Sequence, residues 1–243
     1  MPSEAFSFSR FVTRIIVLAI AVSALNSTLA SAVCPKPHPP VCAEFFHSDA
    51  VFNGTVTSVR HRQESGESGW VYELRVTKLF RGSAQPILQV FTEDASERFL
   101  LEKGNSYLLF AHAFPGGLEI DSCGNSTELG QGVHVVHDLE RVLGEIKSGV
   151  SIGDLNGRVV ESSDTEAGVE GISLAVKDGA TTYSTATDKA GRFRLHLPAG
   201  KYTVQPQTSS WLVSPYDLSY DRPDNLVIHG GGCAELQFLA SPK

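Results

Sequence analysis

Every second side chain is apolar over much of this sequence. In residues 187–204 the alternation covers two short runs, the first of which contains Phe193, Leu195 and Leu197. A period of two is typical of a strand with one buried and one solvated face. Because the turn sequence Pro198-Ala199-Gly200 separates the runs, the pattern predicts two antiparallel strands joined as a hairpin.

The first half of the chain shows the same alternation. Residues 70–80, WVYELRVTKLF, place Trp70, Tyr72 and Leu74 on one face and polar residues on the other. Shorter apolar runs, separated by Gly, Asn and Pro, follow at residues 87–91, 107–111 and 118–120. Because no helical segment long enough for a crossover intervenes, five or six short strands are expected to close into a small barrel.

One segment has a helical period instead. Within residues 137–147 the apolar side chains recur at i, i+3, i+4 and i+7, at Leu139, Val142, Leu143 and Ile146. Gly144 weakens an isolated helix by about 1 kcal/mol relative to alanine, so we expect this helix to be held by packing on a domain.

The N-terminus has the features of a signal peptide. Arg10 and Arg14 precede an apolar run at residues 15–25, and Ala30-Ser31-Ala32 offers a cleavage site of the small-x-small type. The apolar run is too short to span a bilayer core of roughly 30 Å. The sequence therefore predicts a secreted protein, extracellular or periplasmic, with no stable membrane anchor after cleavage of residues 1–32.

The four cysteines fit an oxidising compartment. Cys34, Cys42, Cys123 and Cys233 all follow the predicted cleavage site, and an even number favours two disulfides. We favour a bridge from Cys34 or Cys42 to Cys123, with the remaining cysteine bound to Cys233 across two domains. A zinc site is the alternative, but no C-x-x-C pair accompanies these residues, so we expect no metal.

Charge and motifs argue against several functions. The formal net charge is −7 and no basic patch is present, which makes nucleic acid an unlikely partner. The sequence has no nucleophile elbow, P-loop, H-E-x-x-H motif or dinucleotide-binding glycine pattern. We therefore expect a protein that is not an enzyme and needs no cofactor.

Four motifs in the second half resemble the carboxypeptidase regulatory-like domain. They are G-R-V at Gly157, G-V-x-G-I-x-L-x-V at 168–176, T-D-x-x-G-x-F at Thr187 and L-P-A-G-x-Y-x-V at Leu197. The resemblance implies a seven-stranded transthyretin-like β-sandwich over residues 151–243. It also implies an accessory, non-catalytic domain of secreted proteins, of a kind sometimes grouped with carbohydrate-binding sandwiches.

The first half is similar to the TIMP-like, or netrin-type, OB-fold domain. The matching features are the cysteine leader, A-V-F-x-G-x-V at 50–56, K-x-F-R-G at 78–82, K-G-x-x-Y-L-L-F at 103–110 and S-C-G at Ser122. Well-known members of that superfamily inhibit metalloproteases with a free N-terminal cysteine amine. Here cleavage after Ala32 leaves Val33 ahead of Cys34, so the chelating amine would not belong to cysteine.

The sequence thus predicts an all-β protein with an OB-like barrel of five to six strands over residues 33–136, a short linking helix at 137–150 and the sandwich at 151–243. The leading function is a secreted binding or structural accessory protein whose partner is carbohydrate or an extracellular protein. The alternative is an extracellular protease inhibitor or regulator that acts through the TIMP-like domain. Candidate ligand-binding residues are three aromatics in the long irregular stretch 207–225, namely Trp211, Tyr216 and Tyr220.

Overall fold

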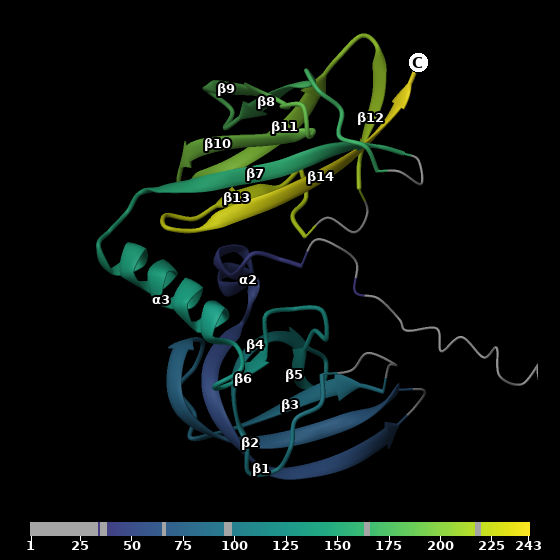
Figure 1. Ribbon diagram of the computed structural model, residues 1–243. Helices are drawn as coiled ribbons and strands as arrows, with labels where there is room; N and C mark the ends of the chain where they lie inside the picture. The colour runs from purple at the N-terminus through teal and green to yellow at the C-terminus, as the bar shows by residue number, and fades with distance from the viewer. Residues whose placement is uncertain (1–33, 35–37, 65–66, 95–98, 163–165, 217–219) are drawn as a thin grey trace, which may run out of the picture. The chain divides into compact units, whose positions relative to one another are not determined.

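A computed structural model describes residues 34, 38–64, 67–94, 99–162, 166–216 and 220–243 (Figure 1). The predicted signal peptide lies outside these residues. Within them the chain is all-β apart from two helices, α2 (Val41–His47) and α3 (Val133–Lys147), which confirms the expected fold class. None of the described helices is long and apolar enough to cross a membrane.

The first half forms the expected barrel. Its strands are β1 (Ala50–Glu64), β2 (Glu67–Arg81), β3 (Ile87–Glu93), β4 (Ser106–Phe114), β5 (Gly117–Ile120) and the short β6 (Thr127–Glu128). The order is β1-β2-β3-β5-β4, and β4 pairs back onto β1, so five strands close a ring. The predicted inward face of β2 is confirmed, because Tyr72 and Leu74 are fully buried in the barrel core.

The long helix packs on this barrel. α3 begins at Val133, four residues before the predicted start at His137. Two of the three added valines, Val135 and Val136, extend the apolar stripe, and Val135 is buried with Leu139 and Val142 against α2 and strands β1 and β4. Because these contacts stabilise the first turn, the helix starts earlier than the apolar stripe from Leu139 indicates.

The end of α3 is closed by a left-handed glycine. Gly149 has φ +70°, and the N–H groups of Gly149 and Val150 donate to the carbonyls of Ile146 and Glu145. This is the arrangement of a Schellman cap, in which the residue after the helix needs positive φ.

Two glycine substitutions, one within α3 and one just after it, are expected to change stability in opposite directions. A side chain at Gly144 would meet nothing within 4 Å, so Gly144→Ala should raise the free energy of unfolding by up to about 1 kcal/mol. Gly149→Ala should lower it by about 1 kcal/mol, because alanine is strained at positive φ. Urea denaturation measures both, and a loss of stability in Gly144→Ala would contradict the packing of α3 described above.

The second half is a sandwich of two four-stranded sheets. Its eight described strands are β7 (Ile152–Glu161), β8 (Ser173–Lys177), β9 (Thr182–Ala186), β10 (Arg192–Pro198), β11 (Gly200–Gln207), β12 (Trp211–Pro215), β13 (Leu226–Ile228) and β14 (Cys233–Pro242). One sheet has the order β10-β7-β14-β12 and the other β13-β11-β8-β9. Apolar side chains from both sheets meet in one core, which includes Leu155, Phe193 and Phe238.

The predicted hairpin at residues 187–204 is wrong in its pairing. Both strands exist as β10 and β11, but β10 pairs with β7 whereas β11 pairs with β8 and β13. The turn at Pro198-Ala199-Gly200 therefore carries the chain from one sheet to the other. Alternation and a tight turn are compatible both with a hairpin within one sheet and with a connection between two sheets. In either case one face of each strand is buried.

The stretch 207–225, predicted to be irregular, contains a strand. β12 pairs antiparallel with the end of β14 and extends the first sheet at its edge. The pattern of WLVSP was too short to distinguish a strand from a loop, and the pairing with β14 supplies the backbone hydrogen bonds that fix it. The last two strands also belong to different sheets, since β13 pairs with β11 and β14 with β7.

Candidate binding groove

The outer face of strands β10, β7 and β14 is polar where the three run side by side (Figure 1). Alternation turns the apolar residues of each strand into the core, so their neighbours face outward. In one row Arg194 and Glu235 flank Asn156, and in the next row Arg192 and Gln237 flank Arg158. Six polar side chains from three strands therefore share one face.

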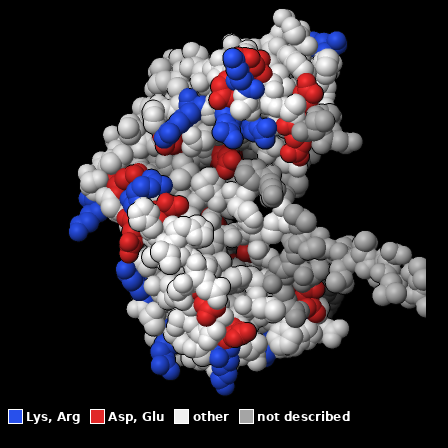
Figure 2. Space-filling view, in the orientation of Figure 1, with Lys and Arg blue, Asp and Glu red and all other residues white. Residues whose placement is uncertain are grey.

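This face is hollowed into a cavity of about 760 Å³, which we call the outer groove. Loop residues Glu166 and Asp188 and the end of β9 form its rim. Figure 2 shows basic and acidic side chains next to one another on the sandwich. The lining offers hydrogen-bond donors and acceptors of several kinds, as a site for a polar ligand requires.

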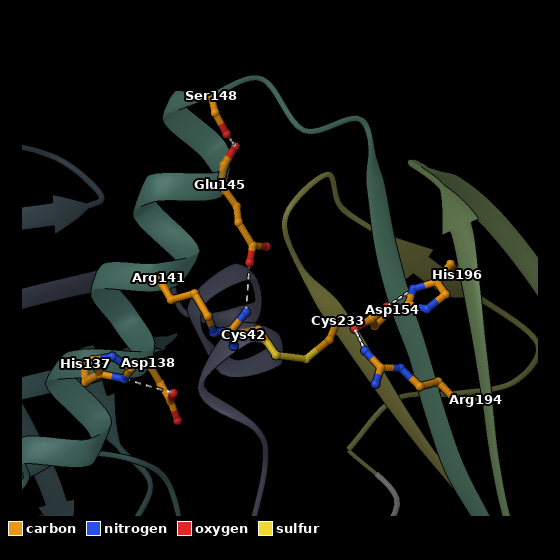
Figure 3. Close-up of polar contacts among 10 residues, drawn as sticks. All are labelled: Cys42, His137, Asp138, Arg141, Glu145, Ser148, Asp154, Arg194, His196 and Cys233. Carbon is orange, nitrogen blue, oxygen red and sulfur yellow. Dashed lines mark hydrogen bonds and ion pairs between the residues drawn. A yellow bond between two sulfur atoms is a disulfide. The ribbon is translucent and has the colours of Figure 1, made fainter.

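The three arginines of the outer groove differ in their partners. Arg194 forms an ion pair with Asp154, whose carboxylate also contacts His196 (Figure 3). Arg158 donates to two backbone carbonyls, those of Ala190 at 3.2 Å and Glu166 at 3.3 Å. Within the described residues, the guanidinium of Arg192 makes no hydrogen bond or ion pair. Among the described residues, neither Arg158 nor Arg192 forms an ion pair, although Glu166, Asp188 and Glu235 also line the groove.

Two of the three carboxylates that line the groove have backbone partners or a shifted pKa. Asp188 Oδ1 accepts the backbone N–H groups of Ala190 and Arg192, which fixes the turn before β10. Burial, together with the neighbouring Asp221, raises the pKa of Glu235 above its ordinary value.

A second hollow of about 510 Å³ adjoins the outer groove. It shares Asn156 and Arg194 with that groove and continues toward the Cys42–Cys233 disulfide and the α3 side chains Arg141 and Glu145. Figure 3 shows α3 on one side of the disulfide and Asp154 and Arg194 on the other. Because the two hollows share lining residues, an extended ligand could occupy both.

All four cysteines form disulfides, which confirms the predicted count. Cys34 bonds to Cys123, and Cys42 bonds to Cys233 over a separation of 191 residues. The pairing of Cys34 with Cys123 selects one of the two alternatives that the sequence left open. The second bridge ties α2 to β14 and hence links the barrel half to the sandwich half of the chain.

A buried carboxylate on α2 lies beside the first disulfide. Glu44 is almost completely inaccessible, and its Oε2 accepts hydrogen bonds from the backbone N–H and the side-chain amide of Asn125, at 2.7 and 2.5 Å. The same amide donates to the carbonyl of Pro39. Burial raises the pKa of Glu44 to about 7, although the hydrogen bonds from Asn125 oppose this shift.

The far end of α2 contacts the sandwich through aromatic and polar groups. His47 Nε2 lies 2.8 Å from the buried carboxylate of Asp221, and Phe46 stacks on His229. The ring of Tyr220 packs edge-on against His47, and its hydroxyl is buried without a hydrogen-bond partner among the described residues. Burial also raises the pKa of Tyr220.

The predicted aromatic site residues do not lie on one platform. Trp211 is half-buried and packs against the sandwich core opposite Pro242, whereas the backbone of Tyr216 bonds to Gln237. Tyr220 lies at the α2 contact. The β14 residues that lie next to these three positions are several residues apart, and a strand rises roughly 3.3 Å per residue. The positions of aromatic residues did not indicate the outer groove. Its only signal in the sequence is the polar residues at alternate positions of the strands.

Among the residues that the structure describes, no three His, Cys, Asp or Glu side chains converge to hold a metal ion. The fold and the groove together define a disulfide-bonded all-β protein with a barrel, a sandwich and a polar groove on the sandwich.

Residues 154–212 match the family model of the carboxypeptidase regulatory-like domain, so the sandwich carries the domain that its motifs resemble. The search of curated proteins gave no match. Among solved structures, the Bacillus anthracis TIE protein is similar at 13% identity and a TM-score of 0.31, over 80% of this chain and 35% of that one. The chain therefore spans about a third of that structure's length.

Proposed function

We propose that this chain is a secreted, non-enzymatic binding protein whose sandwich binds carbohydrate through the outer groove. The observation that supports the proposal best is the groove itself, a hollow of about 760 Å³ floored by polar side chains from three strands. Arginine and amide side chains present several donors and acceptors in fixed directions, which suits the many hydroxyl groups of a sugar. Two disulfides are typical of proteins that fold in an oxidising compartment, in agreement with secretion.

The groove is tested by removing one amide from its floor. Affinity for polysaccharides can be measured from the retardation of the chain in gels that contain them. This affinity should be about fivefold weaker in Asn156→Ala, because a ligand hydrogen bond of roughly 1 kcal/mol is lost. Gln205→Ala is the matched control, since Gln205 is exposed on a strand of the other sheet. If Trp211→Ala abolished retention while Asn156→Ala left it unchanged, the binding site would lie at β12 instead.

The second candidate is regulation of an extracellular protease by the barrel, as a TIMP-like or netrin-type domain. It is favoured by the closed strand order β1-β2-β3-β5-β4 and by the bridge that ties the N-terminal Cys34 to Cys123 at the end of the barrel. N-terminal sequencing of the mature protein, followed by assay of a zinc protease, separates the candidates. A mature chain that began at Cys34 and inhibited the protease would support this second function.

A further inference from the structure

We propose that the carbohydrate bound in the outer groove is acidic: a polysaccharide whose uronic-acid carboxylates bind at Arg158 and Arg192. This inference rests on the proposed carbohydrate-binding function and adds the chemical class of the ligand. It is carried by the placement of two guanidinium groups that the described chain leaves without a carboxylate.

Arg158 and Arg192 are directly opposite each other on neighbouring antiparallel strands. Opposite residues on one face of such a pair have Cβ atoms about 5 Å apart, and like charges at this spacing destabilise the sheet. Arg194 adds a third cation two residues along β10. An anion bound between the two guanidinium groups would offset their mutual repulsion and so stabilise the sheet.

Within the described residues, no carboxylate forms an ion pair with Arg158 or Arg192, although Glu166, Asp188 and Glu235 line the same hollow. The carboxylate of Asp154 is taken up by Arg194 and His196, and Asp188 Oδ1 is taken up by backbone N–H groups. Arg158 donates only to backbone carbonyls. A ligand carboxylate suits these two groups, because it accepts two parallel hydrogen bonds from one guanidinium and is attracted by the other.

A sugar polymer matches the groove better than an acidic peptide. The outward side chains of its floor are all polar, namely Asn156, Arg158, Arg192, Arg194, Glu235 and Gln237. Peptide and protein partners are held mainly by apolar and aromatic anchors, whereas Phe193 and Leu236, which also line the hollow, are buried in the sandwich core. The continuation of the groove into the second hollow suits a chain of several sugar units.

The net charge of −7 does not oppose local binding of a polyanion. At physiological ionic strength charges more than about 8 Å apart are largely screened, so the ligand responds mainly to the groups that line the groove. Arg158 and Arg192 are among these groups. Binding should therefore weaken as salt is added, in contrast to the binding of a neutral sugar.

The test uses the full mature chain and polygalacturonate as the probe, with its methyl-esterified form as the neutral equivalent. We expect calorimetry to show that esterification weakens binding at least tenfold. Arg192→Gln should weaken binding of polygalacturonate by about tenfold and leave binding of the ester unchanged. Arg192→Lys keeps the positive charge but loses the planar guanidinium. Its affinity for polygalacturonate should therefore lie between those of the unchanged protein and Arg192→Gln.

The control is Arg75→Gln, an identical change of charge at an exposed position on β2 of the barrel. Thermal unfolding without ligand adds a readout that a structural role of Arg192 would move: we expect Arg192→Gln to be as stable as the unchanged protein or more stable, because a like-charge pair is removed.

Three results would overturn the inference. Equal binding of polygalacturonate and its ester would leave carbohydrate binding in place but remove the role of the carboxylate. Binding of polyglutamate as tight as that of polygalacturonate would show that the site recognises negative charge and has no preference for sugar. Absence of binding to any polysaccharide would remove the proposed function together with this inference.

Discussion

Replacement of Cys42 and Cys233 together by serine is expected to lower the free energy of unfolding by about 3–5 kcal/mol. The bridge joins residues 191 positions apart, for which the chain-entropy model gives roughly 5 kcal/mol. The first disulfide already shortens the loop that this bridge closes, so 5 kcal/mol is an upper value. Urea denaturation under non-reducing conditions measures the difference.

The matched control is the Cys34→Ser/Cys123→Ser double variant, whose bridge spans 89 residues. Loop entropy grows only with the logarithm of length, and each doubling adds about 0.6 kcal/mol. The two double variants should therefore differ by less than about 1 kcal/mol. A loss below 1 kcal/mol in the Cys42/Cys233 variant would mean that the contacts of α2 with Asp221 and His229 hold the two halves without a covalent link.

The second large effect is expected at Glu44. Because burial raises its pKa from 4.5 to about 7, the folded chain binds this proton more tightly than the unfolded chain does. The contribution of Glu44 to stability is therefore fully present below pH 4.5 and is lost as the pH rises through 7. A difference of this size corresponds to roughly 3 kcal/mol over the whole window.

Glu44→Gln should remove this pH dependence. Its amide oxygen can still accept the hydrogen bonds from Asn125, and no charge has to be buried at high pH. At pH 8 we expect the variant to be more stable than the unchanged protein, and the slope of stability between pH 5 and 7 to become flatter. Denaturation curves at a series of pH values provide the measurement.

The exposed Glu140→Gln on α3 serves as the control for Glu44→Gln, because it removes the same charge from the surface. It should change stability by less than about 0.5 kcal/mol at any pH. If Glu44→Gln were less stable than the unchanged protein at pH 8, the negative charge itself would be required by the Asn125 network.

The elements of this fold could be predicted because their periods are local properties of the sequence. Alternation located β2 and β10, and the i, i+3, i+4, i+7 stripe located α3. Pairing partners could not be predicted in the same way. β10 pairs with β7, where Arg192 lies opposite Arg158, a residue 34 positions earlier in the chain. No local sequence pattern predicts this partner.

The candidate site shows the same limit. The sequence gives Arg192 and Arg194 as solvent-facing residues of a strand, but their meeting with Arg158, Asn156 and Glu235 depends on the strand order. Glu44 is harder still to predict. Its short helix segment resembles any surface turn, and only the contact with Asn125, 81 residues away, shows that the carboxylate is buried. The aromatic residues were conspicuous by type, yet Trp211 packs against the core.

The family match ends at residue 212, whereas the sheet that carries the outer groove needs residues beyond it. β14 lies between β7 and β12 and supplies Glu235 and Gln237 to the groove floor. A fragment limited to the matched residues would therefore lack a central strand and part of the site.

The position of β14 also orders the maturation of the chain. Ribosomes release the N-terminus first, so Cys34 and Cys123 can meet while the sandwich is still being synthesised. Cys42 can form its native bridge only after Cys233, 191 residues later in the chain, has emerged. A chain that stopped before Cys233 would leave Cys42 on α2 without its disulfide partner.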